Sequence, residues 1–203
     1  GSHLPLEENI TLTREVVVYA HKFGVTVEAE LGRLGGIEDD VKVSESDAIL
    51  TNPDEAEKFV QETEVDALAV AVGTSHGAYK FKGEAKLAFE RIEDIKKRVG
   101  IPLVLHGASG VDPEVVAKAE KYGAKLPGAR GVPDEAYRKA ISLGINKTNI
   151  DTDLRLMWTA TVREVIHEKP EVFDPRKILG PAREAVKSVI MKKMEIFGSA
   201  GKA

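Results

Sequence analysis

The chain has no cysteine among its 203 residues, and this absence excludes several kinds of chemistry at once. Disulfides, thiolate zinc sites and a cysteine nucleophile all require that side chain. Any metal bound by this protein must therefore be held by histidine and carboxylate ligands.

Long apolar runs and a strong net charge are also missing. No stretch approaches the roughly 20 apolar residues needed to cross a bilayer, and the N-terminus lacks the charged-then-apolar pattern of a secretory signal. The 29 basic and 33 acidic residues leave a formal charge of −4, so no broad positive field attracts nucleic acid or an anionic membrane. We therefore expect a cytoplasmic protein that holds anionic ligands through local groups.

The pattern that is present is typical of an alternating α/β fold. A helix is expected at 7–23, four buried strands at 25–31, 65–72, 101–105 and 145–151, and further helices at 53–62, 84–98, 112–122, 133–143, 152–167 and 181–197. This order predicts a parallel sheet with right-handed crossovers, in a single domain spanning 1–203.

Four strand-plus-helix units make half of a (β/α)8 barrel, and a small open doubly wound sheet is the alternative. An open sheet concentrates its site at one switch point, whereas a barrel brings every strand end to one shared mouth. Because residues suited to chemistry follow all four predicted strands, the sequence favours the barrel.

Two histidines stand where predicted strands give way to glycine. His76 lies in Gly-Thr-Ser-His-Gly at 73–77, and His106 lies in Leu-His-Gly-Ala-Ser-Gly at 105–110. One such histidine is more often a hydrogen-bonded, half-buried side chain than a ligand. Two in matched positions, at the ends of neighbouring strands, favour a metal site with a phosphate beside it.

Glu30 is the third candidate for this metal site. It lies inside the first predicted strand two residues after Glu28, so both carboxylates project from one face. A carboxylate on a buried strand is costly unless it meets a cation. Glu30 is therefore a candidate metal ligand or a hydrogen-bond partner of one, and a solvated strand edge is the alternative.

Three segments that follow consecutive strands carry signals for phosphate binding. Each offers backbone N–H groups, a cation or a helix N-terminus, although any one alone is weak because Gly/Ser turns are common. The end of the last segment also has the pattern of a helix N-cap, at 151–153, which is the alternative interpretation there. The candidate residues are Gly77 with Lys80, then Gly107, Ala108 and Ser109, and finally Asn149, Ile150, Asp151 and Thr152.

A glycine-flanked acidic segment at 32–40 is expected to be a mobile loop. Glu38 within it could close over a substrate and act as an acid or base, and a solvated surface is the alternative. Arg176 and Arg183 could hold a second phosphate, but helix-end salt bridging is favoured for them from the residues alone.

These motifs together resemble the class II, metal-dependent fructose-bisphosphate aldolases and the closely similar tagatose-bisphosphate aldolases. The matching segments cover essentially the whole chain, at 1–9, 28–32, 35–36, 73–77, 105–110, 149–153, 174–176 and 197–199.

The resemblance implies Zn²⁺ on His76 and His106, with Glu30 at a second or alternative metal position, and a monovalent cation near the phosphate site. It also implies that the phosphate-binding candidates above recognise dihydroxyacetone phosphate, with Asn149 near the substrate hydroxyls. Glu38 matches the loop carboxylate of proton transfer. Arg155 and Arg176 match positions at the other phosphate, and Arg176 reaches a neighbouring subunit.

The reaction implied is the reversible cleavage of fructose 1,6-bisphosphate to dihydroxyacetone phosphate and glyceraldehyde 3-phosphate, a step of glycolysis and gluconeogenesis, in a homo-oligomer. In that family a Leu-Asp-His-Gly segment, with the catalytic aspartate and a third zinc histidine, lies upstream of Gly-Ser-His-Leu-Pro, and it is absent here. The chain therefore resembles the second half of the barrel, strands 5–8. The alternatives are a tagatose 1,6-bisphosphate aldolase and a non-catalytic, phosphate-binding half-barrel that pairs with an N-terminal half.

Overall fold

The computed structural model describes residues 1–33, 35–38, 41–43, 49–76, 87–126 and 129–202, with the backbone alone at 35–38, 41–43 and 75–76. Its helices are α1 (Leu6–His21), α2 (Pro53–Thr63), α3 (Phe89–Val99), α4 (Pro113–Lys121), α5 (Asp134–Ser142), α6 (Thr152–Glu168) and α7 (Pro175–Ile196). Its strands are β1 (Glu28–Leu31), β2 (Gly35–Glu38), β3 (Val41–Val43), β4 (Ala67–Val70), β5 (Ser75–His76), β6 (Leu103–Leu105) and β7 (Ile145–Thr148).

The chain divides into two compact units, which we describe separately. The first comprises Gly1–His76, Ala85–Ala108 and Lys139–Asn149, and the second comprises Gly77–Glu84, Ser109–Arg138 and Ile150–Ala203. The single domain expected over 1–203 stays a prediction.

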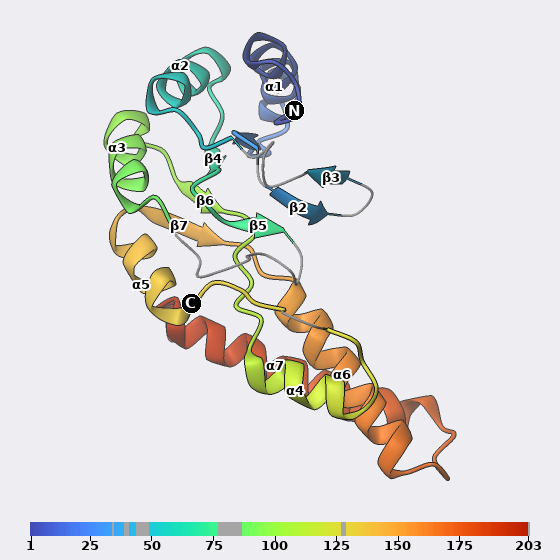
Figure 1. The fold of residues 1–203 in the computed structure, drawn as a ribbon. Helices are drawn as coiled ribbons and strands as arrows, with labels where there is room; N and C mark the ends of the chain where they lie inside the picture. The colour runs from blue at the N-terminus through green and yellow to red at the C-terminus, as the bar shows by residue number, and fades with distance from the viewer. Residues whose placement is uncertain (34, 39–40, 44–48, 77–86, 127–128, 203) are drawn as a thin grey trace. The chain divides into compact units, whose positions relative to one another are not determined.

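A four-stranded parallel sheet in the order β1-β4-β6-β7 forms the centre of the first unit (Figure 1). Each of these strands is added beside the previous one, always on the same side. A doubly wound sheet would instead reverse its order at a switch point, whereas a barrel needs a single direction of growth. The four expected strands and their parallel pairing are confirmed.

The core of the first unit lies around the strands. Apolar residues on both faces of β4 and β6 have no exposed surface, which is why these strands read as continuous apolar runs in the sequence. Helices α1, α2 and α3 pack in succession along this unit (Figure 1), and α2 and α3 bury residues of their own in the core. The fully buried residues include Leu68, Ala69, Val70, Leu103, Val104 and Leu105 from the strands and Phe59, Ile92 and Ile95 from the helices.

Three helices begin with the same local device. Asn52, Asp112 and Asp174 each accept a hydrogen bond from the backbone N–H two residues later, and a proline follows each of them. Because of this cap, α7 begins at Pro175, and Pro181 lies inside the helix. The expected start at 181 is therefore wrong, because the cap at Asp174 already starts the helix and Pro181 lies within it.

One strand of a second, three-stranded sheet, β2, lies within the segment at 32–40 for which the sequence predicts a mobile loop. Strand β2 pairs with β3 in antiparallel fashion and with β5 in parallel, so that Gly36 lies opposite His76. The loop expectation is wrong for 35–38. Its pairing partner β5 is distant in sequence, and strand formation here depends on that partner more than on local composition.

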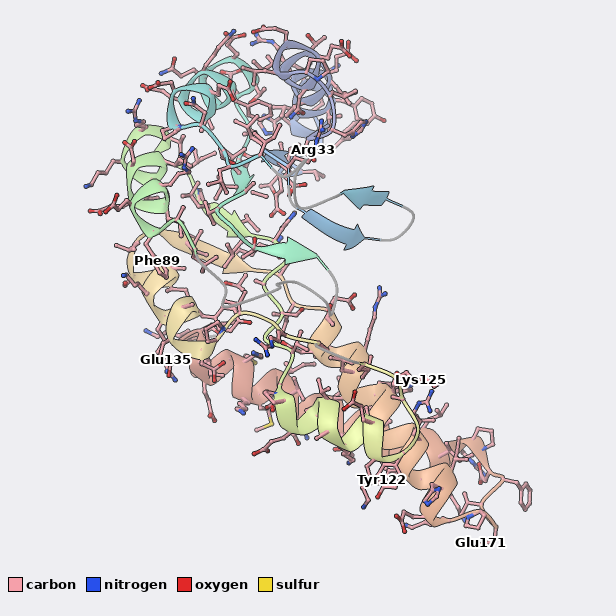
Figure 2. The ribbon with its side chains drawn as sticks, viewed as in Figure 1. Arg33, Phe89, Tyr122, Lys125, Glu135 and Glu171 are labelled. Atoms are coloured by element: carbon pink, nitrogen blue, oxygen red, sulfur yellow. The ribbon has the colours of Figure 1, made fainter. Side chains whose placement is uncertain are left out.

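Helices dominate the second unit. Helix α6 packs against α7 and against α4. At the far end of α4, the Tyr122 hydroxyl donates to a Glu168 carboxylate oxygen at 3.0 Å, and the Arg163 guanidinium donates to the Tyr122 carbonyl at 3.2 Å (Figure 2). Ala160 of α6 and Ala182 of α7 are fully buried in this unit. Within the described part of the chain, no helix combines the length and apolar character needed to span a membrane.

Candidate active site

His106 lies directly after β6 and meets both carboxylates of β1. Its Nδ1 is 3.2 Å from Glu30 Oε1, and its Nε2 is 3.2 Å from Glu28 Oε1. Glu28 and Glu30 reach it from one face of their strand because side chains two residues apart point the same way. Strand β4 lies between β1 and β6, and its Ala69 pairs with Glu30 of β1. A small residue therefore stands between the carboxylates of β1 and the histidine that follows β6.

Two further polar groups complete this cluster. The Lys147 ammonium on β7 donates to Glu28 Oε2 at 2.7 Å, and the Ser2 hydroxyl donates to Glu30 Oε2 at 3.2 Å. The side chains of His106, Glu28 and Glu30 are only 20 to 29% exposed. Lys147 is not among the residues predicted from the sequence. Its position inside a short strand, between Asn146 and Thr148, is nevertheless a signal that one face of that strand is polar.

The two carboxylates favour the charged imidazolium of His106. The hydrogen bond to Glu30 is the main cause that raises the pKa of His106 above its ordinary value. Burial opposes this shift, and the charges of Glu30 and Glu28 add to it.

The chemistry of these donors fits zinc, although the cluster is not a complete metal site. Imidazole nitrogen and carboxylate oxygen are ligands that zinc accepts, and His106 would have to lose its proton before it could bind the ion. Among the residues that the structure describes, no group of three or more histidines, aspartates and glutamates could hold a metal ion. This statement does not cover the His76 side chain, because the structure describes only the backbone of His76, in β5 opposite Gly36.

The segment that follows His106 contacts the start of α6 through Ser109. Gly107 has φ +58°, a conformation that glycine adopts readily and other residues rarely do. In the second unit, the Ser109 hydroxyl oxygen accepts hydrogen bonds from the backbone N–H groups of Asp151 and Thr152, at 3.2 and 3.1 Å. Two of the predicted phosphate-binding segments therefore meet at Ser109.

This contact corrects the expected N-cap of α6. The Asp151 side chain makes no capping hydrogen bond, and its carboxylate pairs instead with Arg155 at 2.7 Å. Ser109 supplies the acceptor that the first N–H groups of the helix need, from outside the helix. The capping role expected at 151–153 is therefore wrong for Asp151.

The remaining candidates fall in different places. Asn149 continues beyond β7, where its backbone N–H donates to the Leu105 carbonyl at 3.0 Å. Arg176 pairs with Asp174 at 2.8 Å and has a side chain that is 91% exposed. Ala108 is fully buried, and Ile150 is partly exposed at the start of the second unit's last segment. Gly77 and Lys80 lie outside the described residues, as does the side chain of Glu38.

Comparison with known proteins decides the family. The family model described as fructose-bisphosphate aldolase class-II matches residues 1–202. The chain belongs to the class II fructose-bisphosphate aldolases. The fructose-bisphosphate aldolase of Thermus caldophilus is 56% identical over 202 residues, which are 100% of this chain and 66% of that protein. The fructose-bisphosphate aldolase of Giardia intestinalis is 52% identical over 205 residues, which are 100% of this chain and 62% of that protein.

Solved structures show the same family fold. The YdjI aldolase of Escherichia coli K12 matches with 35% identity and a TM-score of 0.75, over 100% of this chain and 61% of that one. A putative fructose-1,6-biphosphate aldolase of Coccidioides immitis matches with 31% identity and a TM-score of 0.76, over 99% of this chain and 62% of that one. The chain thus spans just under two thirds of the length of these relatives. Its parallel sheet corresponds to the C-terminal part of their barrel.

The contacts of His106 predict how it titrates in the metal-free protein. We expect the His106 pKa, measured by NMR titration of labelled histidine, to lie above its ordinary value and to fall in Glu30→Gln more than in Glu28→Gln, because Glu30 provides the main contact. Since the folded-state pKa is raised, this interaction stabilises the fold fully below the unfolded pKa of about 6.5, and the stabilisation is lost as pH rises through the folded value.

Lys147→Met is the matched control for this titration. It removes a positive charge from the same cluster, so it should raise the His106 pKa further. A His106 pKa at or below the ordinary value would contradict the described contacts.

Proposed function

We propose that this chain forms the C-terminal part of a zinc-dependent enzyme that reversibly cleaves fructose 1,6-bisphosphate to dihydroxyacetone phosphate and glyceraldehyde 3-phosphate. The observation that carries the proposal is the meeting of His106 with Glu30 at the end of β6, directly before the segment in which Ser109 caps α6. Family membership supports the same reaction. We refer to this chain together with the N-terminal part that its relatives carry as the assembled enzyme.

In this proposal His76 and His106 hold the zinc ion, with Glu30 as a second or alternative ligand. When bound, zinc supplies Lewis-acid polarisation of a substrate carbonyl. Glu30 and Glu28 hold the His106 ring through their contacts with its two nitrogens, and one of these contacts would have to give way for the ring to bind the ion.

The phosphate of dihydroxyacetone phosphate is assigned to the segment after β6 and the start of α6. Gly107, Ala108 and Ser109 contribute backbone and hydroxyl groups, and the helix N-terminus at 150–152 favours an anion. Gly77 and Lys80 add an N–H group and a positive charge. A monovalent cation beside this phosphate is part of the same proposal.

The substrate hydroxyls and the second phosphate are assigned to other residues. Asn149 lies at the end of β7, next to β6, and is suited to hydroxyl groups. Arg155 and Arg176 are assigned to the second phosphate. Both arginines pair with carboxylates near the surface in this structure. Because exposed ion pairs contribute little to the stability of the fold, a phosphate can replace the carboxylate. A homo-oligomeric state, with Arg176 reaching a neighbour, and a cytoplasmic location complete the proposal.

Zinc removal tests the metal site. We expect chelation to abolish turnover of the assembled enzyme, and His106→Ala to remove both metal and activity with little loss of fold, as measured by metal analysis, turnover and circular dichroism. His167→Ala, which removes a histidine from α6, is the matched control and should keep both. Full activity after exhaustive chelation, verified by metal analysis, would rule out the zinc mechanism.

Glu38 is assigned to proton transfer. Glu38→Ala should lower kcat by about 10²–10⁴, the usual contribution of a positioned acid or base, with metal affinity nearly unchanged. Glu55→Ala, on the exposed side of α2, serves as the control for loss of one surface carboxylate. An unchanged kcat in Glu38→Ala would return this residue to a solvated surface role.

The isolated chain is expected to be inactive. Its sheet ends in β1 and β7, which have no further strand beside them among the described residues, and it lacks the aspartate and the third histidine of the family motif. Loss of either group alone should cost at least on the order of 10²-fold in rate. The N-terminal part of a relative, supplied as a separate polypeptide, should restore some activity by pairing with the sheet edges.

The assay uses the gel-filtered 203-residue chain with zinc and fructose 1,6-bisphosphate. Turnover near that of an intact relative, without a second polypeptide, would show that another residue of this chain replaces the missing groups.

A further inference from the structure

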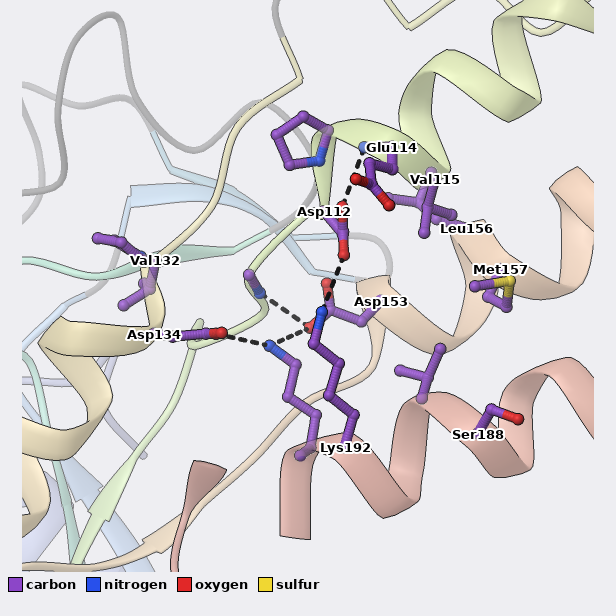
Figure 3. Close-up of a pocket in the computed structure, with 15 residues that line it drawn as sticks. Asp112, Glu114, Val115, Val132, Asp134, Asp153, Leu156, Met157, Ser188 and Lys192 are labelled. Carbon is purple, nitrogen blue, oxygen red and sulfur yellow. Dashed lines mark hydrogen bonds and ion pairs between the residues drawn. The ribbon is translucent and has the colours of Figure 1, made fainter. Parts of the chain in front are cut away.

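A buried ion pair in the second unit lies beside the segment assigned to phosphate. The Asp153 side chain, in the first turn of α6, is 5% exposed, and the Lys193 side chain, near the end of α7, is 11% exposed. Lys193 Nζ lies 3.4 Å from Asp153 Oδ2 and 3.7 Å from Asp134 Oδ1. Figure 3 shows Asp134 and Asp153 on facing sides of a cavity of about 440 Å³ that these residues line.

The Asp153 carboxylate fixes the backbone that follows Ser109. Its Oδ2 accepts the Gly110 N–H at 2.8 Å, and its Oδ1 accepts the Val111 N–H at 2.6 Å. Val111 has φ +50°, a backbone conformation that is strained for a β-branched residue. The two hydrogen bonds that Asp153 accepts from this backbone keep the turn in place despite the strain.

Close packing on both sides allows the turn little freedom. A Cβ at Gly110 would lie 2.8 Å from Lys193 Nζ, and a Cβ at Gly131 would lie 2.2 Å from the Ser109 carbonyl oxygen. The Val132 N–H also donates to that carbonyl at 3.1 Å. At Gly131 a larger side chain would collide with the backbone of the turn, and at Gly110 it would displace the Lys193 ammonium.

Lys193 is the cation that this buried carboxylate requires. An ionised carboxylate removed from water is destabilised unless a positive charge or several hydrogen bonds compensate it. The Tyr137 ring also packs against Lys193, with 4.8 Å between Nζ and the ring centroid. Burial, with Asp153 and Asp134 nearby, raises the pKa of Tyr137, so it remains a neutral phenol and adds no charge.

We propose that Asp153 and Lys193 are positioning residues for phosphate binding. Lys193 pairs with Asp153, Asp153 holds the turn at Gly110 and Val111, and the turn sets the place of Ser109 against the N-terminus of α6. This inference rests on the proposed function, because it takes Ser109 and Thr152 as part of the phosphate site.

The test compares two neighbouring lysines in the assembled enzyme. Lys193→Met should raise KM for fructose 1,6-bisphosphate and Kd for inorganic phosphate by about tenfold or more, with kcat changed less, because a misplaced binding group loses its contact. Lys192→Met removes the same charge one residue away, where Lys192 is 62% exposed and lies 3.5 Å from Asp112 (Figure 3). It should change both constants less than about twofold, as expected for a surface site.

Rescue and amide exchange distinguish positioning from a general loss of charge or stability. Lys193→Arg should restore most of the phosphate affinity, and hydrogen exchange at the Gly110 and Val111 amides should accelerate in Lys193→Met but not in Lys192→Met. If Lys193→Met does not fold, the double variant Asp153→Asn/Lys193→Met, which buries no charge, provides the same comparison and should bind phosphate as weakly.

Three results would overturn the inference. These are unchanged phosphate binding in the folded Lys193 variants, equal effects of Lys192→Met and Lys193→Met, and an assembled enzyme that binds no phosphate. An assembled enzyme that binds phosphate without cleaving the sugar would refute the proposed function alone, and the phosphate comparison would still decide the role of Lys193.

Discussion

Half-buried carboxylates must meet a positive charge, and the polar architecture of this chain follows from that constraint. Glu28 and Glu30 project from a strand of a largely buried sheet, where an uncompensated charge would be costly. The parallel strand order places His106 and Lys147 within reach of them, from β6 and β7. The carboxylates of β1 therefore link it to His106 after β6 and to Lys147 of β7, two strands that are not its neighbours in the sheet.

Part of this arrangement could be predicted from the sequence, and the reason is that its signals are local. The run at 65–72 predicts β4 because a strand buried on both faces is apolar throughout. Asn52 with Pro53 predicts the start of α2, since cap and proline are neighbours in the chain. The strand end at His106 is likewise marked by the glycine that follows it.

The features that sequence reasoning missed depend on partners far away in the chain. Strand β2 pairs with β5, about 40 residues later in the chain. Its own composition, rich in glycine and acidic residues, predicts a loop, because a strand partner that far away leaves no local signal. Lys193 is one of several lysines in α7, and its sequence neighbours do not distinguish it from the others. Its burial depends on Asp153 and Tyr137, and no pattern within α7 reports those contacts.

The charged pairs of this chain differ in their exposure to water, and this exposure decides whether a partner can be exchanged. Arg155 and Arg176 pair with carboxylates while their side chains are 73% and 91% exposed, so water and salt already compete for them. A phosphate dianion offers such an arginine a stronger partner with matching geometry. Asp153 and Lys193 are withdrawn from water, and separating them would leave a buried charge unpaired. The exposed pairs are thus easily exchanged, whereas the buried pair holds the backbone of the turn at Gly110 and Val111 in place.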